Sequence, residues 1–342
     1  MGQSVSGPQR RRLPHSQLHR GPLWVKTAWE FSAKHQSYPP GPRQHWPRIV
    51  ASGAWIRGTV AKGIFVGLST VDVVYGVDKF PSANSKVVAR SQDVFVGGPA
   101  TNASITFAHL GGKSTLVTAV GCHGLANVII EGLRRYSVQL IDLNSDFEQV
   151  PVISSISVNR NGERNVVSAN AMRVTVPPPE VNEIVLMDAA VVLVDGHFME
   201  ACQAWSRAAR ARGTHVVLDG GSWKDGTDEL LKGVDTAICS ADFMPPGCLT
   251  EDGVLKFLLD CGVTNVAITR GDQPIRYVSD KTSGIVPVPE VEIVDTMGAG
   301  DIFHGAFCYY TSTRSPFVDA LRRAASVAAE SCRFHGTREW MK

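Results

Sequence analysis

The sequence contains no long hydrophobic run and few cysteines. None of its apolar stretches approaches the ~18–20 residues that a membrane-spanning helix needs, which argues against a membrane protein. The seven cysteines include no Cys-x-x-Cys pair, and their number is odd. This usage is typical of a reduced, cytoplasmic chain and argues against metal binding by thiolates.

Several nucleotide and metal motifs are also missing. Gly112-Lys113-Ser114 has Phe107 where a P-loop would need its first glycine, so the chain has no Walker A motif. Phe303 stands where a dinucleotide-binding fingerprint beginning at Gly298 would need its third glycine. No His-Glu-x-x-His motif suggests zinc. P-loop NTPases, Rossmann dehydrogenases and zinc hydrolases are therefore disfavoured.

Acidic residues are nearly absent from the first 62 positions. This segment has ten Lys or Arg and one acid, Glu30, so its net charge is +9; the whole chain carries +2, which leaves −7 on the other 280 residues. The Arg- and Ser-rich composition fits a transit-type presequence, and residues 1–6 fit an N-myristoylation pattern. The alternative is a disordered extension, or a start site placed too far upstream. We predict a disordered basic extension over residues 1–62, with no catalytic role and no nucleic-acid-binding signature.

The remaining chain has the composition and rhythm of an α/β domain. Hydrophobic residues make up 44% of the chain and charged residues 19%, as in globular proteins. Short apolar runs that read as buried strands alternate with helical segments, and these runs include 63–68, 116–121, 191–195, 216–219 and 265–268. We predict one three-layer domain over residues 63–342 with a mostly parallel sheet.

Two further segments predict hairpins rather than parallel strands. Residues 73–96 alternate around the turn-like sequence at 81–84, and residues 150–168 contain Asn161-Gly162, which favours a type I′ turn. Asp72 follows the first predicted strand, at the end where such folds bind ligands.

Residues 294–305 combine glycines with an acidic residue at a predicted strand-to-helix turn. The glycines let a ligand approach the backbone, and the helix N-terminus adds unpaired N–H groups and a positive dipole end. Together these features predict an anion-binding site. Asp301 lies one residue beyond it and would repel a phosphate unless it accepts a proton from an attacking nucleophile, which points to phosphoryl transfer. The alternative is that Asp301 caps a helix and the glycines only form a turn.

Residues 295–301, Asp-Thr-Met-Gly-Ala-Gly-Asp, resemble the C-terminal signature of the ribokinase-like (PfkB) carbohydrate kinases at every fixed position. Residues 97–103 resemble the N-terminal signature, and details elsewhere lean toward ketohexokinase-like and sulfofructose-kinase-like members. The resemblance implies a three-layer α/β/α ribokinase-like fold in which the two hairpins form a small β lid. Pro99 stands where ketohexokinases carry an asparagine that touches the sugar, so the identity of the sugar is not implied.

The resemblance also implies the roles of particular residues. Asp301 becomes the general base, and the N–H groups of the residues before it form the anion hole: Gly298, Ala299 and Gly300. The implied substrate-binding residues are Asp72, Gly98 and Asn102. Lys86 on the lid and His197 at the C-terminal end of a predicted strand are further candidates, for which the alternatives are a solvated edge charge and a structural histidine. The implied nucleotide-binding residues are Thr269, Gly271, Arg164, Ser240 and Thr296.

The family's Asn-x-x-Glu motif, which helps to place magnesium and phosphates, is absent. Ser240 and Phe243 occupy its two fixed positions, and Asp242 is the candidate replacement for the missing carboxylate. The implied cofactors are ATP and Mg²⁺, and a monovalent cation such as K⁺ has a candidate site near Gly336-Thr337.

We therefore predict a cytoplasmic, ATP-dependent carbohydrate kinase that transfers the γ-phosphoryl group to a sugar hydroxyl. Its expected partners are a small-molecule sugar and ATP, with no nucleic acid and no membrane, and a homodimer through the lid is left open. The alternatives are a nucleoside kinase of the same fold and a catalytically silent protein that senses sugars or nucleotides.

Overall fold

The computed structural model of the chain describes residues 2, 60–171, 174–280 and 282–342. The extension predicted over residues 1–62 falls almost wholly outside these residues. The described chain forms two sheets, one of nine strands and one of four.

The nine-stranded sheet is mostly parallel, as predicted. Its strands, in spatial order, are β13 (Thr282–Val286), β12 (Gln273–Ser279), β11 (Asn265–Arg270), β10 (Thr236–Ser240), β9 (His215–Gly220), β8 (Val191–Val194), β1 (Lys62–Val66), β4 (Lys113–Thr118) and β5 (Gln139–Asp142). Strands β5 to β11 are parallel to their neighbours in this order, and β12 and β13 add an antiparallel hairpin at one edge.

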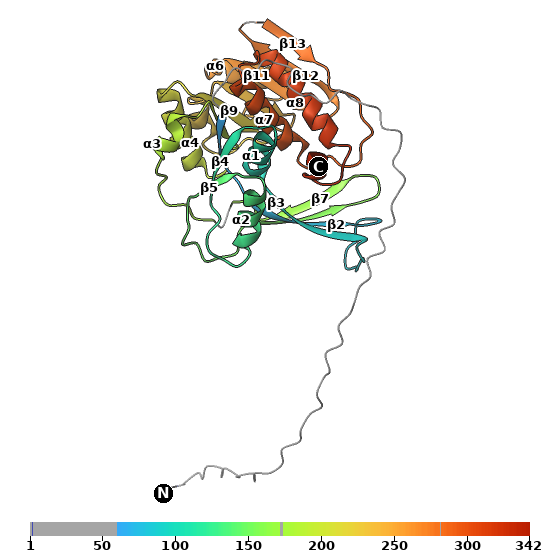
Figure 1. The fold of residues 1–342 in the computed structure, drawn as a ribbon. Coiled ribbons are helices and arrows are strands. Elements are labelled where there is room, and N and C mark those ends of the chain that lie inside the picture. Colours follow the sequence, from blue (N-terminus) through green and yellow to red (C-terminus); the bar gives the residue numbers. More distant parts are fainter. Residues whose placement is uncertain (1, 3–59, 172–173, 281) are drawn as a thin grey trace. The chain divides into compact units, whose positions relative to one another are not determined.

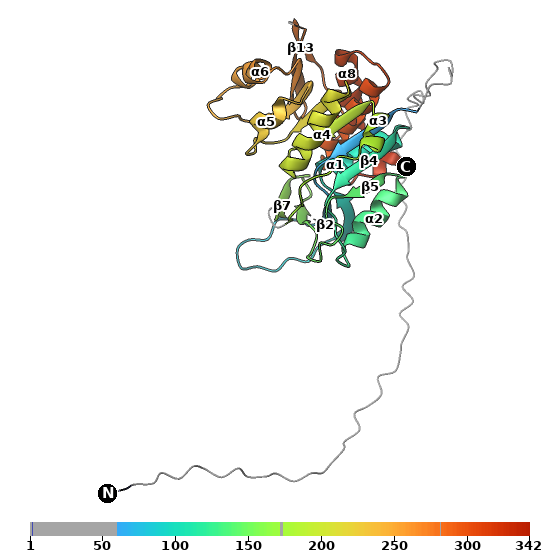
Figure 2. The ribbon, with the colours of Figure 1, turned by 90° about the vertical axis from the view of Figure 1, so that its left-hand side faces the viewer.

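Helices cover both faces of this sheet, which gives the predicted three layers (Figures 1 and 2). The helices on one face are α1 (Pro99–His109), α2 (Ala126–Arg135), α7 (Ala299–Ser312) and α8 (Phe317–Ser331). The helices on the other face are α3 (Glu183–Met187), α4 (Met199–Ala211), α5 (Thr227–Leu231) and α6 (Glu251–Asp260). A 3₁₀ turn, η1 (Glu339–Met341), ends the chain.

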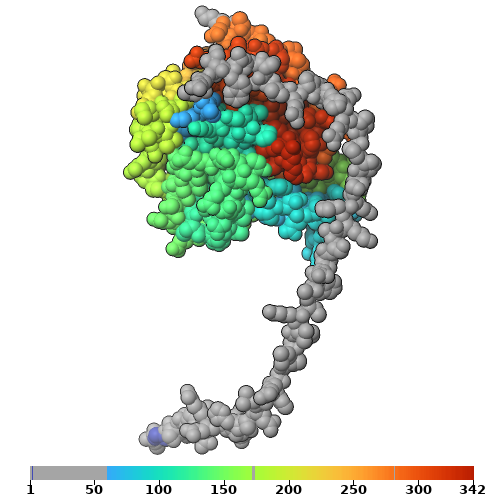
Figure 3. Space-filling model, in the orientation of Figure 1, coloured from blue at the N-terminus to red at the C-terminus, as the bar shows by residue number. Residues whose placement is uncertain are grey.

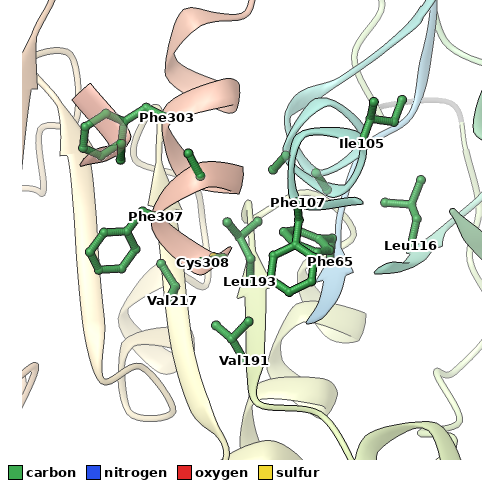
Figure 4. Close-up of a cluster of buried hydrophobic side chains, with 14 of the residues drawn as sticks. Phe65, Ile105, Phe107, Leu116, Val191, Leu193, Val217, Phe303, Phe307 and Cys308 are labelled. Atoms are coloured by element: carbon green, nitrogen blue, oxygen red, sulfur yellow. The ribbon is translucent and has the colours of Figure 1, made fainter. Parts of the chain in front are cut away.

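The two hydrophobic cores follow from the period of two along each buried strand. In β8, Val191 and Leu193 belong to the core under α1 and α7, whereas Val192 and Val194 belong to the core under α4. Figure 4 shows the first of these cores, where Phe65 and Phe107 meet edge to face with ring centroids 5.4 Å apart. Burial of such large side chains supplies most of the stabilisation of this layer.

The predicted hairpins form the second sheet. Its strands, in spatial order, are β3 (Ser91–Gly97), β2 (Thr70–Gly76), β6 (Ile153–Val158) and β7 (Arg164–Ser168). Strands β2 and β3 pair antiparallel, as do β6 and β7, while β2 and β6 run parallel. We call this the small sheet.

Two local predictions about the small sheet were wrong. Asp72 does not end the first strand, because β1 stops at Val66 and the chain enters β2 at Thr70. The β6–β7 connection is not a type I′ turn, since only Gly162 has a positive φ (78°) and its N–H bonds to the carbonyl of Asn159. A longer turn that ends in a left-handed glycine forms instead.

The order of the strands reverses between β1 and β8. From β1 the chain moves through β4 to β5 on one side, and from β8 it moves through β9 and β10 on the other. Ligands of open α/β sheets bind outside the carboxyl ends of the strands at such a switch point. The fold therefore places a candidate site beyond Val66 and Val194.

Candidate active site

The loop that leads into α7 is held by one buried carboxylate. Asp295 accepts hydrogen bonds from the N–H groups of Met297 and Gly336, each at 2.9 Å. Gly298 then begins the helix with φ 68°, in the left-handed region that favours glycine. The loop is thereby tied to the C-terminal segment, and α7 points its N-terminus at the switch point.

One of the three N–H groups predicted to form the anion hole is not free to bind an anion. The N–H of Ala299 donates to the carbonyl of Thr296 at 3.3 Å, so that donor is engaged. Within the described residues, the N–H groups of Gly298 and Gly300 make no hydrogen bond. A Cβ on Gly300 would meet no atom within 4 Å, so open space lies in front of this helix end.

Asp301 lies in the first turn of α7 and is partly buried. Its Oδ2 accepts a hydrogen bond of 2.6 Å from Nδ2 of Asn102, on α1. Burial, together with the nearby Asp219 carboxylate, raises the pKa of Asp301 to about 7, while the hydrogen bond from Asn102 opposes the shift. A carboxyl with this pKa exchanges a proton readily near neutral pH.

Asn102 is itself held by a residue that the sequence did not reveal. Nη2 of Arg338 donates to Oδ1 of Asn102 at 2.7 Å. Arg338 lies two residues beyond the candidate cation site at Gly336, and no periodicity or motif marks it. The contact arises only because the C-terminal segment returns to α1.

Asp72 is buried on β2 of the small sheet. Its Oδ1 accepts a 2.6 Å bond from Oγ1 of Thr70, and burial raises the pKa of Asp72. A Cβ on Gly97 would lie 1.8 Å from Oδ2 of Asp72, so glycine at this position makes room for the carboxylate. Gly98 follows with φ 97° and begins α1, four residues before Asn102.

A second buried carboxylate, Asp195, links the elements that meet at the switch point. It accepts hydrogen bonds from the N–H groups of Leu68 (2.9 Å), Ala100 (3.2 Å) and His197 (2.8 Å). The ring of His197 also lies beside it, with Nδ1 3.2 Å from Oδ1. The geometry favours a structural role for His197 over the predicted contact with substrate. The signal for Asp195 was present, since it follows a buried parallel strand.

His304 and Asp219 lie directly behind the N-terminus of α7. Nδ1 of His304 lies 2.7 Å from the carbonyl of Gly300 and 3.5 Å from Oδ2 of Asp219, and Nε2 lies 3.1 Å from the carbonyl of Ile238. Burial raises the pKa of Asp219, and His304 opposes that shift. Both groups act on the pKa of Asp301, which Asp219 raises and His304 lowers.

A cavity of about 560 Å³ opens in front of α7 on the side of α8. Three predicted nucleotide-binding residues line it, namely Thr269, Gly271 and Thr296, together with Ala299 and Gly300 of the anion hole. Small residues of α8 line its far wall, including Ala325, Ala328 and Ala329. The cavity therefore connects the anion hole to an apolar slot of the size that a ligand such as a nucleotide needs.

Four other predicted residues fall around or outside this cavity. Arg164 approaches it from the small sheet and donates to the carbonyl of Thr296 at 3.3 Å. Ser240 is turned away, since its hydroxyl donates to the carbonyl of Gly221 at 2.8 Å. Lys86 is exposed on the β2–β3 connection rather than on a strand, so the structure does not bring it to the site. Asp242 is exposed as well, and the neighbouring Phe243 is buried against Trp223.

The described part of the chain contains no group of three His, Cys, Asp or Glu side chains that could hold a metal ion. Phe243, where the family carries a carboxylate, points into the core. The donor set for a protein-held Mg²⁺ does not form, so a metal would have to be carried largely by the phosphates of a nucleotide.

The fold and the site together define an α/β protein in which a carboxylate, Asp301, and unpaired N–H groups meet at one helix N-terminus, an arrangement that suits phosphoryl transfer. A sequence model described as the pfkB family of carbohydrate kinases matches residues 61–342, and the chain belongs to this family. Kinases of this family are phosphotransferases that act on hydroxyl groups and use ATP with Mg²⁺. The family-level prediction is thereby confirmed, while the leaning toward ketohexokinase-like or sulfofructose-kinase-like members stays a prediction.

Individual relatives are distant. Ribokinase of Staphylococcus aureus (strain COL) is 24% identical over 258 residues, which cover 72% of this chain and 84% of the ribokinase. Deoxyribokinase of Salmonella typhi is 24% identical over 295 residues, which cover 80% and 92%. The structure of Arabidopsis thaliana ribokinase complexed with ribose and ATP matches with a TM-score of 0.68 at 19% identity and covers 83% of this chain and 99% of that one. At such identities the structural likeness shows the fold. Among the described residues, no helix has the length and apolarity to cross a membrane.

Proposed function

We propose that this protein transfers the γ-phosphoryl group of ATP to a hydroxyl group of a small sugar, with Asp301 as the general base. The observation that carries the proposal is the position of this carboxyl. It has a pKa of about 7 and lies one residue from Gly300, whose N–H makes no hydrogen bond in the described chain. A base and an anion site so close together suit in-line attack on a phosphoryl group.

In this proposal, Asp301 accepts the proton of the attacking hydroxyl while the amide nitrogen of Asn102 stays hydrogen-bonded to Oδ2 of Asp301. The N–H groups of Gly298 and Gly300 donate to the phosphoryl oxygens as charge develops there, and Ala299 joins them if its bond to Thr296 opens. Loss of one such donor typically costs roughly 3 kcal/mol of barrier. Mg²⁺ carried by ATP would neutralise phosphate charge.

The acceptor would lie between α1 and the small sheet. Asp72 offers carboxylate oxygens to the sugar hydroxyls, and Asn102, whose amide already bonds Asp301 and Arg338, would add its remaining N–H; Gly97-Gly98 connects the two. The names of the relatives favour a pentose or related sugar, since they are kinases of ribose and deoxyribose. We infer that the small sheet acts as a lid that excludes water from the reaction. Cytoplasmic location, a homodimer through this sheet and a monovalent cation stay predictions.

The deciding experiment measures ADP release with Mg-ATP against a panel of ketoses, aldoses, phosphorylated and sulfonated sugars, and nucleosides. Asp301→Asn should lower turnover by about 10²-fold or more with the best acceptor, while ATP binding stays unchanged. Asp319→Asn is the matched control, because Asp319 is an exposed carboxylate on α8 that pairs only with Arg322.

The panel also separates the alternatives. A response to nucleosides alone would replace the sugar kinase by a nucleoside kinase of the same fold. Intact ATP binding without ADP release from any acceptor would favour the sensing protein, and full activity of Asp301→Asn would remove Asp301 as the base.

A further inference from the structure

The guanidinium group of Arg338 lies where the C-terminal segment, the small sheet and α1 meet. Nη2 donates to Oδ1 of Asn102 at 2.7 Å and to the carbonyl of Val96 at 3.0 Å. Nη1 donates to the carbonyl of Thr337 at 3.1 Å, and the guanidinium carbon lies 5.7 Å from the ring centroid of Tyr136, the residue that caps the C-terminus of α2. Figure 3 shows the C-terminal residues (red) next to the strands of the small sheet (cyan).

Stability alone does not explain this arginine. The residue is only 7% exposed, and within the described chain no carboxylate oxygen lies within 4 Å of its nitrogens. Its Nε has no hydrogen-bond partner either. Burial lowers the pKa of Arg338 to about 10, while Tyr136, Asp301 and Asp72 oppose the shift. A buried charge without an ion pair is costly, and an apolar side chain of the same volume would avoid that cost.

What Arg338 does is decide the orientation of the Asn102 amide. A guanidinium group has donors and no acceptor, so it can face only the amide oxygen. The amide nitrogen must then point the other way, where it donates to Oδ2 of Asp301 at 2.6 Å. Without Arg338, only Asp301 would orient the amide, and in its protonated form the Asp301 carboxyl could donate to the amide oxygen instead of accepting from the nitrogen.

The same nitrogen of Arg338 also holds the backbone just before Gly97-Gly98, the link between the small sheet and α1 that we call the hinge. Val96 is the last residue before Gly97-Gly98, and it lies on β3, an edge strand of the small sheet. One side chain thus holds both the strand that enters the hinge and the amide that contacts the base. We infer that Arg338 is a positioning residue that couples the small sheet to Asp301 through Asn102. Its catalytic consequence rests on the function proposed above.

Arg338→Met and Arg338→Lys test this coupling. Methionine keeps an apolar stem without donors, whereas lysine keeps the charge but cannot match the planar geometry of two bonds from one guanidinium. The matched control is Arg333→Met, because Arg333 lies five residues earlier, just beyond the end of α8, and among the described residues it pairs only with Glu330 of that helix. All variants are compared as full chains by kcat, by KM for ATP, and by hydrogen–deuterium exchange of peptides covering residues 94–102.

We expect Arg338→Met to lower kcat by about 10- to 100-fold, as small misplacements of reacting groups do, with KM for ATP changed less than about twofold. Arg338 does not line the cavity proposed for the nucleotide. Exchange should become faster within residues 94–102 and stay unchanged in β8 to β11. Arg338→Lys should recover less than half of the lost activity, and Arg333→Met should match the parent protein.

Two results would overturn the inference. Unchanged exchange at residues 94–102 in Arg338→Met would show that Arg338 does not anchor the hinge. Full kcat in Arg338→Lys would show that charge, rather than the paired geometry, is what matters. The exchange measurement needs no turnover, so it decides on the anchoring even if the parent protein releases no ADP, which would count against the proposed function alone.

Discussion

At the scale of residues, the proton on Asp301 should govern the acid side of the activity. Its pKa is raised to about 7, chiefly by burial, and it must be deprotonated to accept a proton from the hydroxyl. We expect kcat/KM to fall about tenfold per pH unit below an apparent pKa near 7 and to level off above it. Because Asp219 interacts with Asp301, the measured value belongs to the pair. A profile that stays flat down to pH 5 would contradict the assignment.

The same raised pKa predicts a stability effect of the opposite sign to the activity effect. The folded protein holds the Asp301 proton more tightly than the unfolded chain does, so the wild type loses stability as pH rises from about 4 through about 7. Asp301→Asn removes the buried charge and keeps an oxygen that can accept from Asn102. It should raise the free energy of unfolding at pH 8 by on the order of 2–4 kcal/mol. Urea unfolding should show that this gain nearly disappears at pH 4, and a gain independent of pH would contradict the cause.

At the scale of elements, the start of α7 offers two glycines with opposite expected responses. Gly300→Ala adds a methyl group that meets no atom within 4 Å, so the melting temperature should stay or rise, because alanine favours helix. That methyl group would project into the cavity, and KM for ATP should increase at least about tenfold. Gly298→Ala is the contrasting variant, and it should destabilise the fold. The φ of Gly298 is 68°, which strains an alanine, and the new Cβ would lie only 2.7 Å from Cγ2 of Thr337. Wild-type KM for ATP in Gly300→Ala would place the phosphates elsewhere.

The sequence patterns predicted that the strands of the small sheet and helix α7 form, but they were less accurate about the residues at which these elements begin. The period of two revealed the hairpins of the small sheet, and the Gly-Ala-Gly run revealed the N-terminus of α7. Asp72 was placed at the end of the first strand because residues 63–68 are continuously apolar, whereas the positive φ of Gly67 (156°) ends β1 and Thr70 opens a new strand. A local apolar run cannot show where one sheet stops and another starts, since that depends on which strands pair.

At the scale of the whole molecule, the contacts that complete the site are those the sequence could not predict. Asn102 and Arg338 are 236 positions apart, and Asn102 and Asp301 are 199 positions apart. Neither contact has a local period or spacing, because each depends on α1 and α7 packing side by side and on the C-terminal segment returning to them. The carboxylates at strand ends, such as Asp195 and Asp219, were visible in the sequence, but the roles that follow from their neighbours were not.

A last prediction concerns how little of the chain the kinase domain needs before β1. The family match begins at residue 61, and Ala61 and Lys62 already contribute, because their carbonyls accept from the N–H groups of Lys113 and Ala190 at 2.9 Å each. A chain that starts at residue 60 should keep the parent's kcat and melting temperature. A chain that starts at residue 64 loses both acceptors, about 2 kcal/mol together, as well as the exposed Lys62–Asp188 ion pair, so it should melt several degrees lower. Calorimetry of the two truncated chains measures the difference, and a loss already present at residue 60 would show that the preceding segment stabilises the domain.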